Sequence, residues 1–249
     1  MSHRPRRGDI PGMSNNTDTP NTPESTPRPH FYLLLDRSGS MESMRRDVIG
    51  GFNQFIAEQQ ANGPDARITL VQFDTQDPQE VLLDARGIRR AQPLTMDSFV
   101  PRGGTPLLDA TGRLIARASI REAERKSLAK RPEDVTVVTI TDGEENQSRE
   151  YTRDAIKRLV ADKQAGGWSF VFLGAGLDAY AEARSLGYDP RSVQAFAPDA
   201  AGARVSFANM STAMTRKRDL LRRGEAFDKA DFWQGDKAAE ADRDRRHLN

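Results

Sequence analysis

Apolar runs of strand length alternate with helical patterns from residue 30 onward, and this alternation constrains the fold more than any other feature. The strand-like runs are rich in β-branched and aromatic residues and cover 30–35, 68–73, 80–83, 135–140, 169–173 and 192–196. Strand and helix patterns that take turns along a chain are typical of βαβ units. We therefore predict an α/β fold, doubly wound, whose mostly parallel sheet is flanked by helices and has one antiparallel edge strand at 80–83.

Apolar residues at three- and four-residue steps mark the buried stripes of the longer predicted helices. These stripes are Val48, Phe52, Phe55, Ile56 and Gln59; Leu107, Leu108, Thr111, Leu114, Ile115 and Ala118; Ile156, Leu159 and Val160; and Phe207, Met210, Met214 and Leu221. Because the two methionines belong to such a stripe, we interpret them as core contacts rather than metal ligands. A further helix is predicted at 178–186, after a glycine turn.

We expect three regions in the chain. Residues 1–29 are rich in Pro, Thr, Ser and Asn and lack periodicity, which predicts a disordered extension. Residues 30–222 carry the alternating pattern and form the predicted domain. Residues 223–249 form a charged tail, whose aromatic side chains either dock on the domain or bind a partner protein when free. We favour docking, because apolar surface is unfavourable in water. The end of that tail, 242–247, is expected to be disordered.

Oxygen-bearing side chains stand beside the predicted ends of strands and the start of one helix. They are Asp36, Ser38 and Ser40, after the first strand, Thr105, before a helical pattern, and Asp142, after a later strand. The carboxyl ends of parallel strands meet at one edge of a sheet, and ligands bind there. Two carboxylates and three hydroxyls at that edge predict a site for a hard divalent cation.

The spacing of the first segment suits Mg²⁺. Asp36, Ser38 and Ser40 stand at alternate positions, so in a near-extended loop their oxygens project to one side. Gly39 lets the backbone turn tightly between the serines. Mg²⁺ keeps several waters and is usually held by one or two carboxylates. A metal held mainly by neutral hydroxyls retains positive charge and an exchangeable position, which suits the capture of a carboxylate from outside.

These residues resemble the metal-ion-dependent adhesion site of von Willebrand factor type A domains. The family pattern is Asp-x-Ser-x-Ser, then a separated Thr, then Asp-Gly after the fourth strand. Asp36, Ser38 and Ser40 match the first element, Thr105 the second and Asp142 the third. The resemblance spans about 36 to 175 and extends to about 222. The sequence Asp-Arg-Ser-Gly-Ser-Met at 36–41 is similar to that of bacterial and phage intracellular members.

The resemblance implies a Mg²⁺-dependent or Mn²⁺-dependent protein-binding module rather than an enzyme. In the family the two serines and the threonine can ligate the metal directly, the aspartates often act through water, and an Asp or Glu of the partner protein completes the shell. Some intracellular members work beside AAA+ ATPases or in stress-response systems. A cytoplasmic protein with such a partner is therefore the expectation.

Simpler roles compete for each of these residues. A Ser or Thr before a helix is most often an N-cap, so Ser40 and Thr105 have capping as an alternative. Asp142 followed by Gly is by itself typical of a turn. Glu144 and Glu145 either tune the site or begin a helix with acidic residues. Asp36 is harder to explain away, because a carboxylate at the end of an apolar strand needs a partner for its charge.

Composition narrows the function classes. The chain has 37 basic and 36 acidic residues, which gives no overall attraction to nucleic acid or membranes. It has no cysteine and three histidines, His3, His30 and His247, which disfavours disulfides and zinc sites. No run approaches the roughly 20 apolar residues of a membrane span.

The rival function is a Mg²⁺-dependent phosphoryl-transfer or hydrolytic enzyme that uses the same carboxylates. The sequence has no P-loop, and no His or Lys is placed as an obvious acid or base. Ser38 also occupies the place where a haloacid-dehalogenase-like phosphatase needs a second Asp. A scaffold with an empty site is the third alternative.

Overall fold

The computed structural model describes residues 26–176 and 178–247. Its strands are β1 (Arg28–Asp36), β2 (Arg67–Phe73), β3 (Glu80–Gly87), β4 (Glu133–Thr141), β5 (Ser169–Ala175) and β6 (Val193–Phe196). They form one six-stranded sheet in the order β3-β2-β1-β4-β5-β6. All neighbouring strands pair in parallel except β2 and β3. The predicted α/β sheet with one antiparallel edge strand is confirmed.

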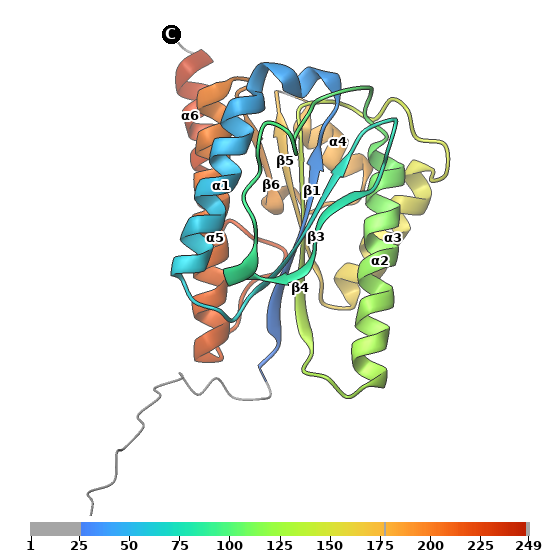
Figure 1. Cartoon of the computed structure of the whole chain (residues 1–249), viewed down its shortest axis with the longest axis vertical. Helices are drawn as coiled ribbons and strands as arrows, with labels where there is room; N and C mark the ends of the chain where they lie inside the picture. Colours follow the sequence, from blue (N-terminus) through green and yellow to red (C-terminus); the bar gives the residue numbers. More distant parts are fainter. Residues whose placement is uncertain (1–25, 177, 248–249) are drawn as a thin grey trace, which may run out of the picture.

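Helices cover both faces of the sheet (Figure 1). On one face lie α1 (Arg45–Ala61), α5 (Ala200–Arg223) and α6 (Ala238–His247), and on the other lie α2 (Leu107–Ser127), α3 (Arg153–Ala165) and α4 (Ala179–Ser185). Short 3-10 turns occupy Gly39–Met44, Ile88–Arg90 and Pro190–Ser192. The fold is therefore doubly wound, as predicted.

Alternation along β1 divides the interior into two cores. Phe31, Leu33 and Leu35 face the core shared with α1 and α5, whereas Tyr32 and Leu34 face the core shared with α2 and α3. A central parallel strand is covered on both faces, so its sequence is apolar nearly throughout. This is why 30–35 reads as a continuous apolar run rather than an alternating one.

The predicted elements are present, with shifts at their ends. β1 begins at Arg28, two residues before the apolar run, and β3 continues to Gly87. The extra length of β3 includes register irregularities opposite Ile68 to Val71 and a positive φ at Ala85. The apolar residues of the helical stripes face the cores as predicted, except Leu221, which is half-buried and belongs to neither core. Met210 and Met214 are fully buried.

The C-terminal tail corrects one prediction and confirms another. The expectation of disorder at 242–247 is wrong, because these residues belong to α6, where Ala239 is buried and Arg246 pairs with Asp199 and Asp242. The docking of aromatic residues is confirmed, since Phe232 and Trp233 are completely buried. The predicted division of the chain at residues 29 and 222 stays a prediction, and residues 1–25 lie outside the described part.

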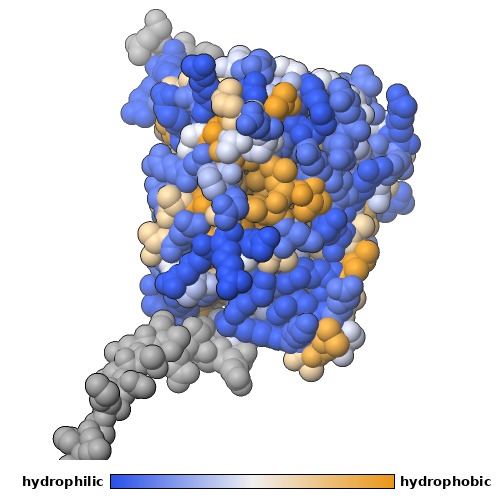
Figure 2. Space-filling view, in the orientation of Figure 1, coloured by the Kyte–Doolittle hydropathy of each residue, from blue (hydrophilic) through white to orange (hydrophobic). Residues whose placement is uncertain are grey.

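Hydrophilic residues dominate the face shown in Figure 2, with a hydrophobic area near its centre. In the described part of the chain, the large apolar side chains that are exposed are Met96, Val100, Ile120 and Leu128. No described helix combines the length and apolar composition that crossing a bilayer requires.

Candidate metal site

The predicted site residues gather where the sheet reverses its winding. β1 and β4 are neighbours in the centre of the sheet, and the chain runs outward in opposite directions from them. Asp36 ends β1, and Asp142 directly follows β4. Ligands of doubly wound folds bind at this switch point, outside the carboxyl ends of the strands. The topology therefore brings the two aspartates together from positions more than a hundred residues apart.

Asp36 is completely buried and is held by neutral donors. Its Oδ1 accepts a hydrogen bond from the Ser38 backbone N–H at 2.7 Å, and its Oδ2 accepts one from the Thr141 hydroxyl at 2.6 Å. Burial raises the pKa of Asp36 to about 7, although these hydrogen bonds partly oppose the rise. The charged form of this carboxylate is therefore costly in the absence of a cation.

A chain of hydroxyls links the first segment to Asp142. The Ser38 and Ser40 hydroxyls lie 3.0 Å apart, and the Ser40 hydroxyl donates to Asp142 Oδ1 at 2.8 Å. Burial also raises the pKa of Asp142. Four of the five predicted residues thus belong to one hydrogen-bonded network, which Asp36 joins through the backbone of Ser38.

Thr105 lies beside this network without a direct hydrogen bond to the other four residues. A Cβ placed on Gly143 would lie 3.1 Å from the Thr105 hydroxyl and 3.9 Å from Asp36 Oδ2. Glycine at this position therefore keeps the space between the threonine and the aspartate open. Asn146 fixes the Thr105 backbone, because its Oδ1 accepts from the Thr105 N–H at 3.0 Å and its own N–H donates to the Thr105 carbonyl.

The capping alternatives are wrong for both hydroxyl residues. Ser40 lies inside the 3-10 turn, and α1 begins only at Arg45. Pro106, not Thr105, occupies the N-cap position of α2. The loop also departs from the expected near-extended path, because the 3-10 turn begins at Gly39. This turn carries the Ser40 hydroxyl back toward Asp142.

The two glutamates after Asp142 have separate roles. Glu145 accepts hydrogen bonds from the Leu108 N–H at 2.8 Å and from the Ser148 N–H and hydroxyl. It therefore caps the start of α2 and orders its own loop. The alternative of an acidic helix start at Glu144 and Glu145 is wrong, because the next helix begins only at Arg153. Glu144 is exposed and borders a hollow of about 150 Å³ beside Asp142.

Several residues that support the site were not predicted from the sequence. Thr141 ends β4 and donates to Asp36. Asp74 directly follows β2 and accepts hydrogen bonds from Arg37 and Arg102, which flank the predicted ligands. The signal for Asp74 was present, since a carboxylate after an apolar strand is the same pattern that marks Asp36.

The donor set fits a small hard cation. No ion pair joins Asp36 or Asp142 to a lysine or arginine within residues 26–176 and 178–247. Groups of three or more Asp, Glu, His or Cys side chains that could hold a metal are not found there either, so hydroxyls must complete any shell. Mg²⁺ accepts such a shell, because it binds through one or two carboxylates and keeps several waters.

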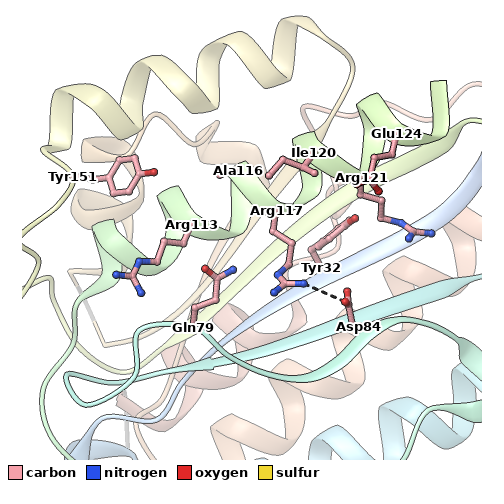
Figure 3. Close-up of a pocket in the computed structure, with 10 residues that line it drawn as sticks. All are labelled: Tyr32, Gln79, Asp84, Arg113, Ala116, Arg117, Ile120, Arg121, Glu124 and Tyr151. Atoms are coloured by element: carbon pink, nitrogen blue, oxygen red, sulfur yellow. Dashed lines mark hydrogen bonds and ion pairs between the residues drawn. The ribbon is translucent and has the colours of Figure 1, made fainter. Parts of the chain in front are cut away.

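A larger hollow of about 500 Å³ lies away from these residues, between α2 and β3 (Figure 3). Three arginines of α2 line it, and each is paired with a carboxylate: Arg113 with Glu150, Arg117 with Asp84 and Arg121 with Glu133. None of the five predicted site residues contributes to this hollow. The charges of its three arginines are therefore paired, unlike those of Asp36 and Asp142.

Known structures share this architecture. No protein-family model matches the chain, and no curated protein matches it. The pilus adhesin SpaC from Lactobacillus rhamnosus GG aligns with a TM-score of 0.58 at 14% identity, over 77% of this chain and 31% of the adhesin. A von Willebrand factor type A protein from Catenulispora acidiphila aligns with a TM-score of 0.52 at 18% identity, over 76% of this chain and 43% of that one.

The vWF domain of the type V pili tip protein Mfa5 from Porphyromonas gingivalis is similar along nearly its whole length. It aligns with a TM-score of 0.54 at 13% identity, over 81% of this chain and 99% of that domain. The chain spans about a third of the length of the SpaC adhesin. These likenesses show the von Willebrand factor A fold.

Proposed function

We propose that this chain is a non-enzymatic protein-binding module that holds Mg²⁺ and uses it to capture an Asp or Glu of a partner protein. The residues that would hold the metal are Asp36, Ser38, Ser40, Thr105 and Asp142. The observation that carries the proposal is the pair of carboxylates, Asp36 and Asp142, gathered with three hydroxyls at the switch point of the sheet and without a cationic partner among the described residues.

A divalent cation would offset the cost of those carboxylates. Burial without a counter-charge favours the protonated form of Asp36, and a bound metal would favour the charged form instead. Two carboxylates and neutral hydroxyls would leave Mg²⁺ electron-poor. A partner carboxylate would then gain a charge-assisted contact in a partly desolvated groove, which is stronger than the same contact in open water.

The fold supports an interaction module over an enzyme. The similar structures include a pilus adhesin and a pili tip protein, which align over 77% and 81% of this chain. The kind of partner remains the one that the family resemblance implies, an AAA+ ATPase or a stress-response complex in the cytoplasm.

The first test is calorimetric titration of the full chain with Mg²⁺ and Mn²⁺. We expect one site, lost in Asp36→Ala and Asp142→Asn and kept in Asp97→Asn, which changes an exposed aspartate outside the cluster. Unaltered affinity in Asp36→Ala would refute the metal site. Circular dichroism of each variant confirms that the fold persists.

The second test concerns the capture of a partner protein. We expect affinity capture from a lysate to require Mg²⁺, to fail in chelator, and to weaken sharply in Thr105→Ala. Because Thr105 does not cap α2, its replacement should leave the melting temperature within a degree or two. A parallel screen with phosphatase substrates tests the enzymatic alternative, which metal-dependent turnover lost in Asp36→Ala would favour.

A further inference from the structure

A buried carboxylate after β2 joins the two loops that carry the candidate metal ligands. Asp74 is completely buried. Its Oδ2 accepts hydrogen bonds from Arg37 Nε at 2.8 Å and from Arg102 Nε at 2.9 Å. Arg37 stands between Asp36 and Ser38, and Arg102 lies three residues before Thr105. One carboxylate thus contacts a side chain from each half of the candidate site.

Backbone hydrogen bonds complete the link between the same loops. The Arg102 N–H donates to the Arg37 carbonyl at 2.8 Å, and the Gly39 N–H donates to the Gly103 carbonyl at 3.0 Å. Gly103 has a φ of +64°, and a Cβ there would lie only 2.3 Å from the Thr75 hydroxyl. The loops 36–40 and 101–105 are therefore held against each other and against the turn after β2.

Asp74 is itself fixed and charged. Its Oδ1 accepts from the backbone N–H groups of Gln76 at 2.6 Å and Asp77 at 3.0 Å. Burial opposes its ionisation, but these N–H groups and the two arginines outweigh burial and keep the pKa of Asp74 below its ordinary value. One ionised side chain thus accepts hydrogen bonds from four donors and cannot move without breaking them.

We propose that Asp74 is a positioning residue that holds the loops of Ser38, Ser40 and Thr105 at a separation suited to a small cation. This inference rests on the proposed metal site. Mg²⁺ demands a near-ideal octahedron of oxygens at about 2.1 Å, whereas Ca²⁺ accepts six to eight oxygens at about 2.3–2.6 Å in flexible geometry. A rigid pair of loops therefore favours Mg²⁺, and loosening them removes the advantage over Ca²⁺.

The test compares affinities for Mg²⁺ and Ca²⁺ in the full chain. Asp74→Asn keeps the shape of the side chain but removes its charge. Arg102→Gln removes one donor from a residue that is 39% exposed, so it leaves no buried charge unpaired. Glu80→Gln is the matched control, because Glu80 pairs with Arg37 from a half-buried position and has no hydrogen bond or ion pair to the loop at 101–105.

We expect Asp74→Asn and Arg102→Gln to weaken Mg²⁺ binding by about ten- to a hundred-fold, as loss of a supporting contact does at other metal sites. Ca²⁺ binding should weaken less, so that the ratio of the two affinities falls. Glu80→Gln should leave this ratio unchanged. Thermal melting of each variant is measured in parallel.

Two results would overturn the inference. The first is an equal loss of Mg²⁺ and Ca²⁺ affinity together with a lower melting temperature, which shows general support of the fold. The second is unchanged Mg²⁺ affinity in folded Arg102→Gln, which decides the question if Asp74→Asn does not fold. Absence of any Mg²⁺ binding by the unsubstituted chain is a different result, because it refutes the metal site itself.

Discussion

Asp36 places a buried carboxylate at the carboxyl end of β1, where it loses its contact with water. Hydrogen bonds from Ser38 and Thr141 recover only part of that solvation, and burial raises its pKa to about 7. A residue with this cost is retained most readily where its charge is used. The consequence is a measurable dependence of stability on pH and on metal.

The sign of that dependence follows from the raised pKa of Asp36. The folded protein holds the Asp36 proton to about pH 7, whereas the unfolded chain releases it near its ordinary value of 3.8. The folded state thus binds more protons between these values, and stability falls as pH rises through them. Without divalent metal, we expect the melting temperature to fall, relative to that of Asp36→Asn, between about pH 4 and pH 7.

Mg²⁺ should reverse this fall, because the metal competes with the proton for the same oxygens. We expect the rise in melting temperature on adding Mg²⁺ to be larger at the alkaline end of the range. Asp36→Asn is the control and should lose the metal effect and the part of the slope that Asp36 contributes. An equal Mg²⁺ effect at both ends of the range would contradict this prediction.

Two buried tyrosines offer a matched comparison at the residue scale. The hydroxyl of Tyr32 is buried at the edge of the hollow in Figure 3 without a hydrogen-bond partner in the described part of the chain. The hydroxyl of Tyr188 lies 2.9 Å from that of Thr139. Tyr32→Phe should therefore leave the free energy of unfolding unchanged or raise it, whereas Tyr188→Phe should lower it by about 1 kcal/mol. Chemical denaturation measures both, and equal losses would show that Tyr32 has a partner.

At the scale of elements, the sequence predicted the strands well because most are buried on both faces. Continuous apolar runs such as 68–73 and 169–173 have few alternatives when helical stripes separate them. The strand order was not predicted, since parallel pairing leaves no local signal of which strands are neighbours. The antiparallel edge at β3 was predicted because a short turn precedes it, but its irregular second half was not.

The candidate site was predicted where chemistry sits in short motifs and was missed where it depends on pairing in space. Asp36, Ser38 and Ser40 form the pattern Asp-x-Ser-x-Ser directly after a strand, which can be recognised in the sequence. Asp74 reads as the start of a turn, and only the adjacency of β2 and β1 reveals that it contacts Arg37. Thr141 reads as one more β-branched residue of its strand. Supporting residues of this kind stand at no fixed spacing from the predicted ligands, so no sequence motif identifies them.

The start of β1 yields a prediction about where the fold begins. Arg28 and Pro29 pair with Glu133 and Asp134 of β4, and the Arg28 N–H donates to the Pro132 carbonyl at 2.9 Å. A chain that begins at His30 should therefore melt a few degrees below one that begins at Thr26. Differential scanning calorimetry compares the two, and identical melting temperatures would show that these pairings contribute nothing.

At the scale of the whole molecule, the C-terminal residues behave as part of the folded body. Trp233 is completely buried against Phe232, and the Ser192 hydroxyl donates to the Ala230 carbonyl at 2.7 Å. Trp233→Ala should lower the free energy of unfolding by about 3–5 kcal/mol, as large-to-small changes of buried aromatics do. Phe227→Ala, at a partly buried position, should cost less. Urea unfolding followed by far-UV circular dichroism distinguishes them, and a Trp233 loss no larger than that of Phe227 would contradict the prediction.

The segment that leads into α6 also closes the outer side of β6. Lys237 donates to the Val193 carbonyl at 2.8 Å, and Glu240 accepts from the Ala195 N–H at 3.2 Å. These are backbone groups that an edge strand otherwise offers to a strand from another molecule. Because the side chains of Lys237 and Glu240 occupy them, β6 is protected from pairing with a strand of another molecule. A chain that ends before Lys237 would leave these backbone groups of β6 unpaired. We expect it to aggregate in concentrated solution.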